Sequence, residues 1–378
     1  MAQIQLSREQ VIGFRWRAHQ LDRAAGCAAG PADVALLDFG VQNTGQDAAR
    51  WALANRGLQD YDETELLLAW TLRVSPHLYR RSDAAEVAIA TAPLSEADAA
   101  KRILDASKPL RVANIAVLDA LATVARSERE IVTKPTVKGA LSQALSKALD
   151  GPYLRWCNPC NVLHCWESPF RMAALQAGLE LQPNTSPPVL QRIRGFSPPL
   201  FGRLGDTASG QFDVVRNCLR FYGPARPKEV ATFLDAPVKD VVGHWPADAV
   251  SVGVTGSLGG ADGSMLPDDV PAAESVEKPS DVRLLGPYDG YLQLKDRALL
   301  VADAAQSKEL WRTLGRPGAV AVDGEIIGTW RPRSSGKKLT VNWQPWAPIS
   351  KLRCADIQLQ AERLAGVRGQ RLSAVVEV

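Results

Sequence analysis

The sequence predicts an α+β fold made of several domains, and three observations support this. Helical segments followed by an extended, often basic segment recur three times before residue 281. From Val282 onward the pattern changes to short strands separated by turn residues. The length of 378 residues exceeds what one ordinary core accommodates. We therefore expect three tandem helix-and-wing units and a β-rich C-terminal domain, either a small β-barrel or a curled sheet. The predicted units are residues 1–94, 95–195, 196–281 (including a linker) and 282–378.

The first unit begins with a helix at Ser7, which stands at capping-box spacing from the glutamine three residues later. Asp47–Arg56 has helical periodicity, and Asp47 is expected to cap that helix. Thr64–Trp70 is predicted as a further helix, and Thr71–Arg81 as the extended basic segment. Between the first two helices lies the polar stretch Gly40–Arg50, which taken alone is typical of a capping loop.

The second unit contains one or two helices across Ala100–Ser127 and a helix at Thr136–Ala148, with Thr136 as its expected cap. A cysteine-rich segment, Trp156–Cys165, follows. Its Cys157, Cys160, His164 and Cys165 could hold zinc, but structural zinc sites usually draw ligands from two separated knuckles. A packed wing or turn with buried thiols is the favoured interpretation, so no metal ligand is assigned.

The third unit contains helices at Val214–Tyr222 and within Pro224–Asp235, and a hairpin at Val250–Leu266 that turns at the glycine-rich Gly256–Gly263. Pro267–Asp281 is polar and proline-bearing, and is predicted to be a linker. The C-terminal domain is expected to contain five strands and a final helix. The strands are Val282–Leu285, Ala298–Val301, Ala319–Val322, Ile326–Trp330 and Leu339–Trp343, and the helix is Ile357–Leu364.

Composition describes a globular protein, with 46% apolar and 22% charged residues. No apolar run approaches membrane-spanning length and no signal-peptide core is evident, so a cytoplasmic, monomeric protein without membrane contact is expected. The six cysteines fit reduced thiols in that compartment. The net charge is only +3, so any affinity for DNA must come from an uneven placement of charge.

Several motifs occur together in one order along the chain. They are Trp70-Thr71-Leu72-Arg73, the Trp156–Cys165 cluster, Leu219-Arg220-Phe221-Tyr222-Gly223-Pro224, Leu284-Leu285-Gly286-Pro287-Tyr288-Asp289, Lys295-Asp296-Arg297 and Val322–Arg331. This series of motifs resembles the bacterial winged-helix DNA glycosylases of the AlkZ and YcaQ type, and matching segments extend from Leu6 to about Trp346. The resemblance implies three tandem winged-helix motifs and a C-terminal β-barrel around a C-shaped DNA channel. It also implies cleavage of the N-glycosidic bond of alkylated purines, including bulky adducts and interstrand crosslinks, in some members for antibiotic self-resistance.

The family pattern assigns catalysis to the polar stretch near residue 42. One branch carries Gln-apolar-Gln there and the other Gln-apolar-Asp, whereas this chain has Gln42-Asn43-Thr44. Alkylation at guanine N7 leaves the base positively charged and a good leaving group, so no general acid is required. The enzyme must hold a water against C1′ and stabilise the oxocarbenium-like charge, which an amide oxygen can do. Gln42 is the candidate for that role, with Asn43 and Thr44 completing the water's hydrogen bonds. No cofactor is expected.

Double-stranded DNA carrying alkylated purines is the expected partner, held through its phosphates. The candidate contacts are Arg73, Arg80, Arg81, Lys134, Lys138, Arg331, Arg333, Lys337 and Lys338. The last four surround a Ser-Ser-Gly turn that could enter the minor groove or be merely an exposed, charged turn. The alternative function is a non-catalytic winged-helix protein, either a regulator or a binder of adducts. A metal-dependent nuclease is disfavoured, because no Asp, Glu and His cluster has ligand spacing.

Overall fold

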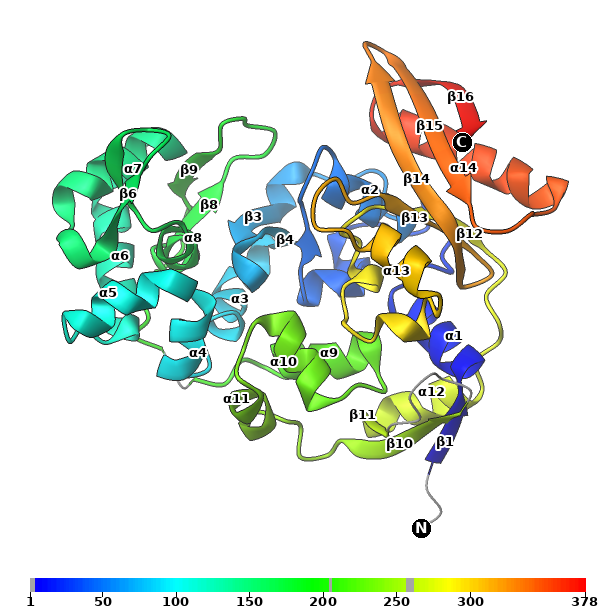
Figure 1. Ribbon diagram of the computed structural model, residues 1–378, viewed down its shortest axis with the longest axis horizontal. Coiled ribbons are helices and arrows are strands. Elements are labelled where there is room, and N and C mark those ends of the chain that lie inside the picture. Colours follow the sequence, from blue (N-terminus) through cyan, green and yellow to red (C-terminus); the bar gives the residue numbers. More distant parts are fainter. Residues whose placement is uncertain (1–3, 204–205, 256–261) are drawn as a thin grey trace.

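The computed structural model describes residues 4–203, 206–255 and 262–378. The second unit forms a lobe on one side of the molecule, the first and third units form the centre, and the C-terminal strands project on the other side (Figure 1). Across these described ranges, no helix is long and apolar enough to cross a membrane.

The first unit begins with strand β1 (Ile4–Ser7) and helix α1 (Arg8–Ala18). The predicted capping box is confirmed: the Ser7 hydroxyl accepts from the Gln10 backbone nitrogen, and the Gln10 side chain accepts from the Ser7 nitrogen. β1 pairs in parallel with β10 (Val250–Thr255) of the third unit. Backbone hydrogen bonds therefore join the start of the first unit to the third unit.

A three-stranded sheet follows, in the order β2-β4-β3, with helix α2 (Ala48–Asn55) between its first two strands in the chain. Its strands are β2 (Val41–Gln42), β3 (Leu66–Trp70) and β4 (Pro76–Arg80). The predicted helix at Thr64–Trp70 is wrong, because only a short 3₁₀ turn precedes β3. Every residue of β3 is buried, and a short apolar run covered on both faces has no alternation to distinguish strand from helix.

The second unit is mainly helical and carries two small sheets. Helix α3 (Ala84–Ala90) closes the first unit, and the helices of the second unit are α4 (Glu96–Arg102), α5 (Ser107–Val112), α6 (Val117–Ile131), α7 (Lys138–Ala148) and α8 (Glu167–Gln176). Its strands are β5 (Thr136–Val137), β6 (Leu154–Cys157), β7 (Val162–Cys165), β8 (Leu179–Leu181) and β9 (Val189–Arg192). The predicted cap of α7 is wrong, because Val137 occupies the cap position and the Thr136 hydroxyl donates to the Lys134 carbonyl instead.

The third unit contains α9 (Val214–Tyr222), as predicted, with α10 (Pro227–Leu234) and α11 (Val238–Gly243). The predicted hairpin is confirmed as β10 paired with β11 (Gly263–Met265), while most of its glycine-rich turn lies outside the described residues. The predicted linker is wrong in part. Helix α12 (Val270–Glu274) forms within it and buries Val270 and Ala273 against α1.

The C-terminal segment forms a five-stranded sheet in the order β12-β13-β14-β15-β16. Its elements are β12 (Val282–Leu285), α13 (Ala304–Leu310), β13 (Gly318–Val322), β14 (Glu325–Ser335), β15 (Lys338–Pro345), α14 (Lys351–Val367) and β16 (Arg371–Glu377). The described strands do not close a barrel, and Ala298–Val301 lies at a 3₁₀ turn and not in a strand. The physical reason is that α14 contacts both edge strands, β12 and β16, and packs Ile357 and Leu364 against the buried residues of the sheet, so a helix and not further strands covers these apolar residues.

Two of the predicted units share one hydrophobic core. Phe39 of the first unit stacks on Phe221 and Phe233 of the third, with ring centroids 5.9 and 5.6 Å apart. The core of the second unit also includes Leu68 and Trp70 of β3, and α2 adds Trp51 to the core of the C-terminal sheet. The mixed α+β class is therefore confirmed, and the polar stretch after β2 lies where the packed units meet.

Candidate functional site

Strand geometry divides the predicted catalytic triplet between two faces of one loop. Gln42 ends β2 and pairs with His77 of β4, and the Asn43 nitrogen still donates to the Pro76 carbonyl at 2.8 Å. Because successive side chains of an extended chain point to opposite faces, Gln42 and Thr44 share one face and Asn43 lies on the other. The triplet is therefore not a single cluster.

The Gln42 side chain is held at both ends of its amide group. Its oxygen accepts from the Arg73 guanidinium at 2.6 Å, and its nitrogen donates to the Thr44 hydroxyl at 2.9 Å. The side chain is buried, with 8% exposed. These two bonds fix the direction of the amide dipole before any ligand arrives, which is the preorganisation that electrostatic catalysis requires.

The backbone that leads into the triplet approaches Tyr79 closely. Gly40 has a φ of +102°, and a Cβ atom at this position would lie 2.6 Å from the Tyr79 ring. The Tyr79 hydroxyl is 2.7 Å from the Thr71 hydroxyl, so the ring cannot easily move aside. Only glycine satisfies both the backbone conformation and the contact.

Arg73, predicted as a phosphate contact, belongs to a group of four cations that we call the central basic cluster. Its members are Arg73, Lys295, Arg297 and Arg316. Burial is the main cause that lowers the pKa of each, and neighbouring cations of the cluster lower the pKa of Arg73, Lys295 and Arg297 further. None of the four forms an ion pair among the described residues. Such a cluster is electrostatically suited to bind an anion.

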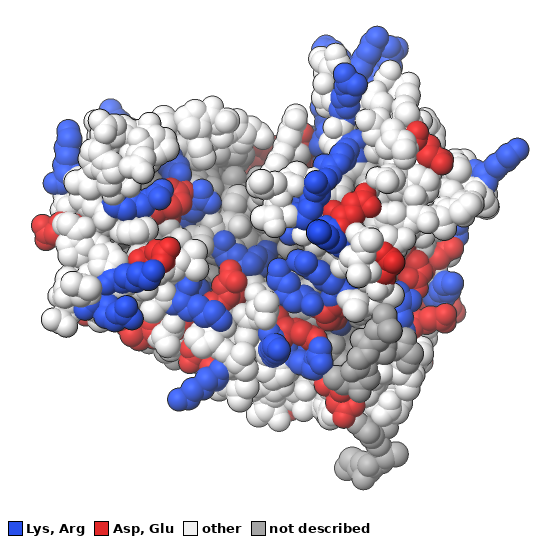
Figure 2. Space-filling view, viewed as in Figure 1, with Lys and Arg blue, Asp and Glu red and all other residues white. Residues whose placement is uncertain are grey.

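The guanidinium groups of the central basic cluster have unused donors. Arg73 Nη1, Arg297 Nε and Arg316 Nε are buried and have no hydrogen-bond partner within the described structure. Arg73 lies over the Phe233 ring at 4.3 Å, Arg297 over Trp311 at 5.0 Å and Arg316 over Tyr288 at 4.9 Å. Figure 2 shows lysine and arginine side chains gathered near the centre of this face and along the projecting hairpin. Sequence reasoning missed Lys295, Arg297 and Arg316 because they stand apart from Arg73 in the chain.

The other face of the loop opens into a cavity of about 640 Å³, which we call the interunit cleft. One wall consists of apolar residues of β3 and β4, namely Leu66, Leu68, Trp70 and Leu78. The opposite wall comes from residues 180–188, the loop between β8 and β9 of the second unit. Asn43 and Asp47 also line the cleft, together with Tyr61 and Glu63. The cleft thus combines an apolar wall with carboxylates.

Asp47 does not cap α2 as predicted. It occupies the cap position with a φ of +54°, but its side chain accepts no cap hydrogen bond. The Asn43 side chain instead accepts from the Ala49 nitrogen at 3.2 Å, and the Asp47 carboxylate lies 3.9 Å from Arg368 Nε. The capping prediction for Asp47 is therefore wrong: Asn43 satisfies a backbone nitrogen in the first turn of α2, and Asp47 lines the interunit cleft.

Three of the predicted DNA contacts are engaged within the protein. Arg80 donates to Asp38 and Asp83 and to two backbone carbonyls. Arg81 pairs with Glu180 at 2.8 Å, which ties β4 to the second unit. Lys138 pairs with Glu167 at 2.6 Å. Of these three cations, Arg81 joins two units, whereas Arg80 and Lys138 pair within their own units. A sequence pattern of basic residues does not distinguish such structural roles from phosphate binding.

The remaining predicted contacts are exposed. Lys134 precedes β5, and the four basic residues Arg331, Arg333, Lys337 and Lys338 lie on the hairpin of β14 and β15. This hairpin projects from the body of the molecule (Figure 1). Its cations are available to a ligand in a way that Arg80, Arg81 and Lys138 are not.

Comparisons with known proteins identify a family and a similar fold. The family model described as DNA glycosylase AlkZ-like matches residues 36–367. The chain belongs to the AlkZ-like DNA glycosylase family. A solved structure of similar fold is the Streptomyces sahachiroi DNA glycosylase AlkZ, with a TM-score of 0.70 and 18% identity over 99% of this chain and 100% of that chain. No curated protein matches the chain.

A buried histidine, His77 of β4, lies opposite Gln42 in the sheet of this AlkZ-like protein. Burial, and secondarily the Arg73 charge, lowers the pKa of His77 from 6.5 to about 3. Its Nδ1 is 2.9 Å from the Ser75 carbonyl, to which the neutral ring can donate. Because the folded pKa is depressed, the unfolded chain takes up the proton first as pH falls. We therefore expect His77 to contribute stability above pH 6.5 that is lost progressively toward pH 3.

Urea unfolding at several pH values between neutral and mildly acidic tests this expectation. As the pH falls, the free energy of unfolding should decrease less in His77→Gln than in the native protein. An equal loss in both would contradict this assignment.

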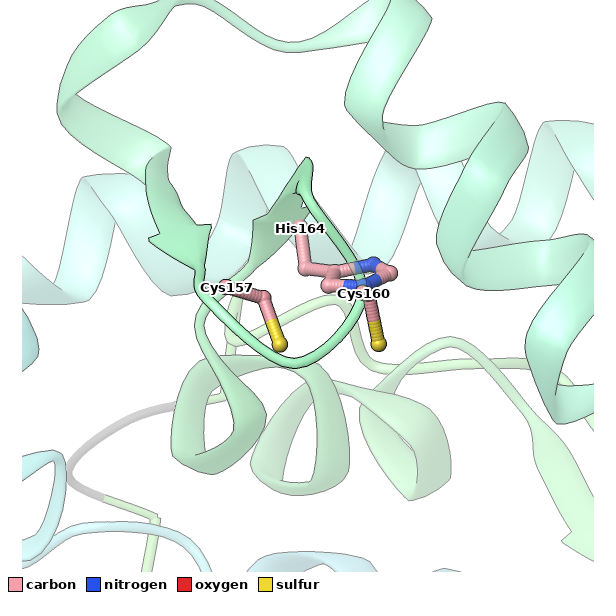
Figure 3. A group of neighbouring side chains, drawn as sticks. All are labelled: Cys157, Cys160 and His164. Carbon is pink, nitrogen blue, oxygen red and sulfur yellow. The ribbon is translucent and has the colours of Figure 1, made fainter.

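One further group in this AlkZ-like protein has the chemistry of a metal site. The ligand atoms of Cys157, Cys160 and His164 lie within 4.8 Å of one another on the hairpin of β6 and β7 (Figure 3). Cys160 is exposed and Cys157 is partly buried, so the prediction of buried thiols holds only for Cys165. Cys165 belongs to the core of the second unit and not to this group.

Proposed function

We propose that this protein is a monofunctional DNA glycosylase that hydrolyses the N-glycosidic bond of N7-alkylguanine-type adducts and leaves an abasic site. We further propose that the adducts are bulky or crosslinking products of natural alkylators, and that the protein serves repair or antibiotic self-resistance. Membership of the AlkZ-like family supports the reaction class. The three helix-and-wing units and the projecting hairpin would surround double-stranded DNA in a C-shaped channel, with the protein acting as a monomer.

The observation that carries this proposal is the position of the loop after β2 between two different surfaces. Gln42 and Thr44 face Arg73 of the central basic cluster, whereas Asn43 and Asp47 line the interunit cleft. A damaged nucleotide lying across this loop would have its phosphates on the basic side and its base on the cleft side. Its C1′ atom would then lie over the polar triplet, where hydrolysis takes place.

The chemistry of the cleft suits a positively charged base with an apolar substituent. Trp70 and its apolar neighbours provide a surface for the substituent, and the carboxylates of Asp47, Glu63 and Glu180 line the same cavity. Glu180 is already paired with Arg81, and the Asp47 carboxylate lies 3.9 Å from Arg368 Nε, which leaves Glu63 as the carboxylate without an ion pair among the described residues to oppose the charge of the base. A volume of about 640 Å³ is within the range of small-molecule pockets and exceeds what a methyl group needs.

We assign complementary roles to the residues of the loop. The Gln42 amide, oriented by Arg73 and Thr44, would position the attacking water, and Asn43 would contact the base from the interunit cleft. The Asp47 carboxylate would stabilise the oxocarbenium-like charge as the bond breaks, since the charge develops close to the loop. No acid is needed to expel the base, because the alkylated purine leaves as a neutral molecule.

The hairpin of β14 and β15 would hold the duplex through its exposed cations. The Arg331→Gln, Arg333→Gln double variant should reduce the slope of log binding constant against log salt by up to about 1.8, or ~0.9 for each lost phosphate contact. Titration of an undamaged duplex at several salt concentrations measures this slope. The matched control is Lys108→Gln, Arg111→Gln on α5, where both cations are also exposed. Equal slopes in the two double variants would show that the hairpin does not contact the DNA phosphates.

The reaction is tested with duplexes that carry a single N7-alkylguanine, either bulky or methylated. After incubation with the protein, heating in alkali converts abasic sites into strand breaks. We expect breaks above the protein-free control, with faster excision of the bulky adduct. If only the methylated duplex shows breaks, the proposed preference for bulky adducts is wrong, but the proposal that the protein is a DNA glycosylase stands.

A second candidate function is adduct binding without excision, and one observation favours it. The Gln42 oxygen is already engaged by a guanidinium, which reduces its ability to stabilise positive charge. If the damaged duplex binds more tightly than the undamaged one but no strand breaks form, the protein is an adduct binder and the enzyme proposal fails.

A further inference from the structure

We propose that Cys157, Cys160 and His164 form a zinc site that fixes the hairpin of β6 and β7. This goes beyond the glycosylase reaction, since the hairpin lies in the second unit and contributes no residue to the loop after β2 or the interunit cleft. The fourth coordination position would be taken by water or by an external ligand.

The register of the hairpin directs the three side chains to one side. Cys157 is opposite Val162, and Arg155 is opposite His164. Residues directly opposite each other share a face of a sheet, as do residues two apart in a strand. Cys157 and His164 are therefore diagonal neighbours on one face, and Leu154 and Cys165 form the pair that faces the other way.

The turn between the two strands brings the third ligand over the same face. The Asn161 nitrogen donates to the Cys157 carbonyl at 2.8 Å, which closes a tight turn around Cys160. Asn161 has a φ of +53°, so the backbone reverses sharply after Cys160. This brings the thiol of a Cys-x-x-Cys pair back toward the first thiol, as in a zinc knuckle.

The distances are short enough for coordination without a change of fold. Tetrahedral zinc with sulfur ligands at about 2.3 Å and nitrogen at about 2.0 Å requires ligand atoms roughly 3.5 to 3.8 Å apart. The three ligand atoms already lie within 4.8 Å of one another. Small side-chain rotations on an exposed hairpin can supply the remaining movement.

A neighbouring helix orients the imidazole. The Ser142 hydroxyl of α7 is 3.2 Å from His164 Nδ1. If Nδ1 carries the proton and donates to this hydroxyl, the lone pair remains on Nε2 for the metal. Ligating histidines usually have such an outer partner, which fixes both the tautomer and the ring.

The outer part of the hairpin lacks the burial that holds its base, where Cys165 belongs to the core of the second unit and Leu154 packs against that core. β6 and β7 form a two-stranded sheet that pairs with no other described strand. Trp156 is 55% exposed, Val162 45% and Leu163 48%, so its large apolar residues contribute little to a core. An isolated two-stranded hairpin is marginally stable in water, and metal binding can provide the missing stabilisation.

Binding is charge-balanced. Each of the two thiols loses its proton to solvent as its sulfur bonds to Zn²⁺, and the neutral imidazole binds without losing a proton from its coordinating nitrogen. The resulting site is neutral. Its formation releases protons, so its affinity must rise with pH.

The test measures metal content and does not depend on excision activity. The full chain is prepared under reducing conditions with added zinc, dialysed and analysed for metal. We expect roughly one zinc per chain. Cobalt(II) in its place should give thiolate-to-metal absorption in the near ultraviolet and strong visible bands of tetrahedral coordination. The Cys157→Ser, Cys160→Ser double variant should lose both signals while its far-ultraviolet circular dichroism stays native.

The matched control is Cys27→Ser, Cys354→Ser, which also removes two exposed thiols. It should retain zinc and the cobalt spectrum. Absence of bound metal in the reduced native protein overturns the proposal, as does zinc retained by the Cys157, Cys160 variant. Equal loss in both variants would also overturn it, since the metal would then not be held by this group.

Discussion

Replacing Gln42 with alanine is expected to lower the rate of adduct excision about a hundredfold, which corresponds to ~3 kcal/mol of transition-state stabilisation. The change removes the amide that Arg73 and Thr44 hold in one orientation. It also leaves the buried Arg73 guanidinium without its partner on the loop. Single-turnover excision from a duplex with one N7-alkylguanine measures the effect directly, because product release does not enter the rate.

The matched control is Gln358 of α14, which is exposed and lines neither the loop after β2 nor the interunit cleft. Gln358→Ala should excise at nearly the native rate. Asn43→Ala tests the cleft side of the loop, and it should slow excision without releasing Arg73. If Gln42→Ala excises as fast as the native protein while Asn43→Ala does not, the water-positioning role belongs to Asn43 alone.

Replacing Asp289 with asparagine is expected to reduce the free energy of unfolding by about 3–5 kcal/mol. Asp289 accepts two hydrogen bonds from Arg56, at 2.8 and 3.0 Å, and both side chains are fully buried. Asparagine nearly preserves the shape but removes the charge, so the Arg56 guanidinium remains buried and unpaired. Urea or thermal unfolding measures the loss.

An exposed pair of the same geometry provides the comparison. Arg216 donates two hydrogen bonds to Asp248, and both side chains are partly exposed. Asp248→Asn should reduce the free energy of unfolding far less, because water and salt screen an exposed pair. Similar losses in the two variants would mean that burial does not determine the strength of the Arg56 pair.

The sequence predicted those elements whose ends carry local signals. Helix α1 has its capping box and α9 begins after Asp213, which accepts from the Arg216 nitrogen. β3 was predicted as a helix because its burial on both faces comes from other parts of the chain, which no local pattern reveals. The prediction of a closed barrel was wrong for a related reason, because α14 contacts the edge strands of the sheet only after the chain has folded.

The candidate site was predictable in part. The family pattern selected Gln42, but the strand that turns Gln42 and Asn43 to opposite faces pairs with a segment more than 30 residues away. The central basic cluster joins residues from two distant regions, so charge spacing could not reveal it. Arg80 and Arg81 have the composition of a DNA contact, yet their partners Asp38 and Glu180 are fixed only by tertiary structure.

The attachment of helix α2 to the C-terminal sheet limits how this chain can be divided or recombined. Trp51 donates to the Leu284 carbonyl at 2.5 Å, Asn55 donates to the same oxygen at 3.1 Å, and Arg363 donates to the Ala54 carbonyl. A fragment ending before Val282 would expose Trp51, of which only 2% is accessible in the whole chain. The C-terminal domain is therefore not an interchangeable module. Grafting it from a relative to alter substrate range would require the matching α2 surface to be transferred with it.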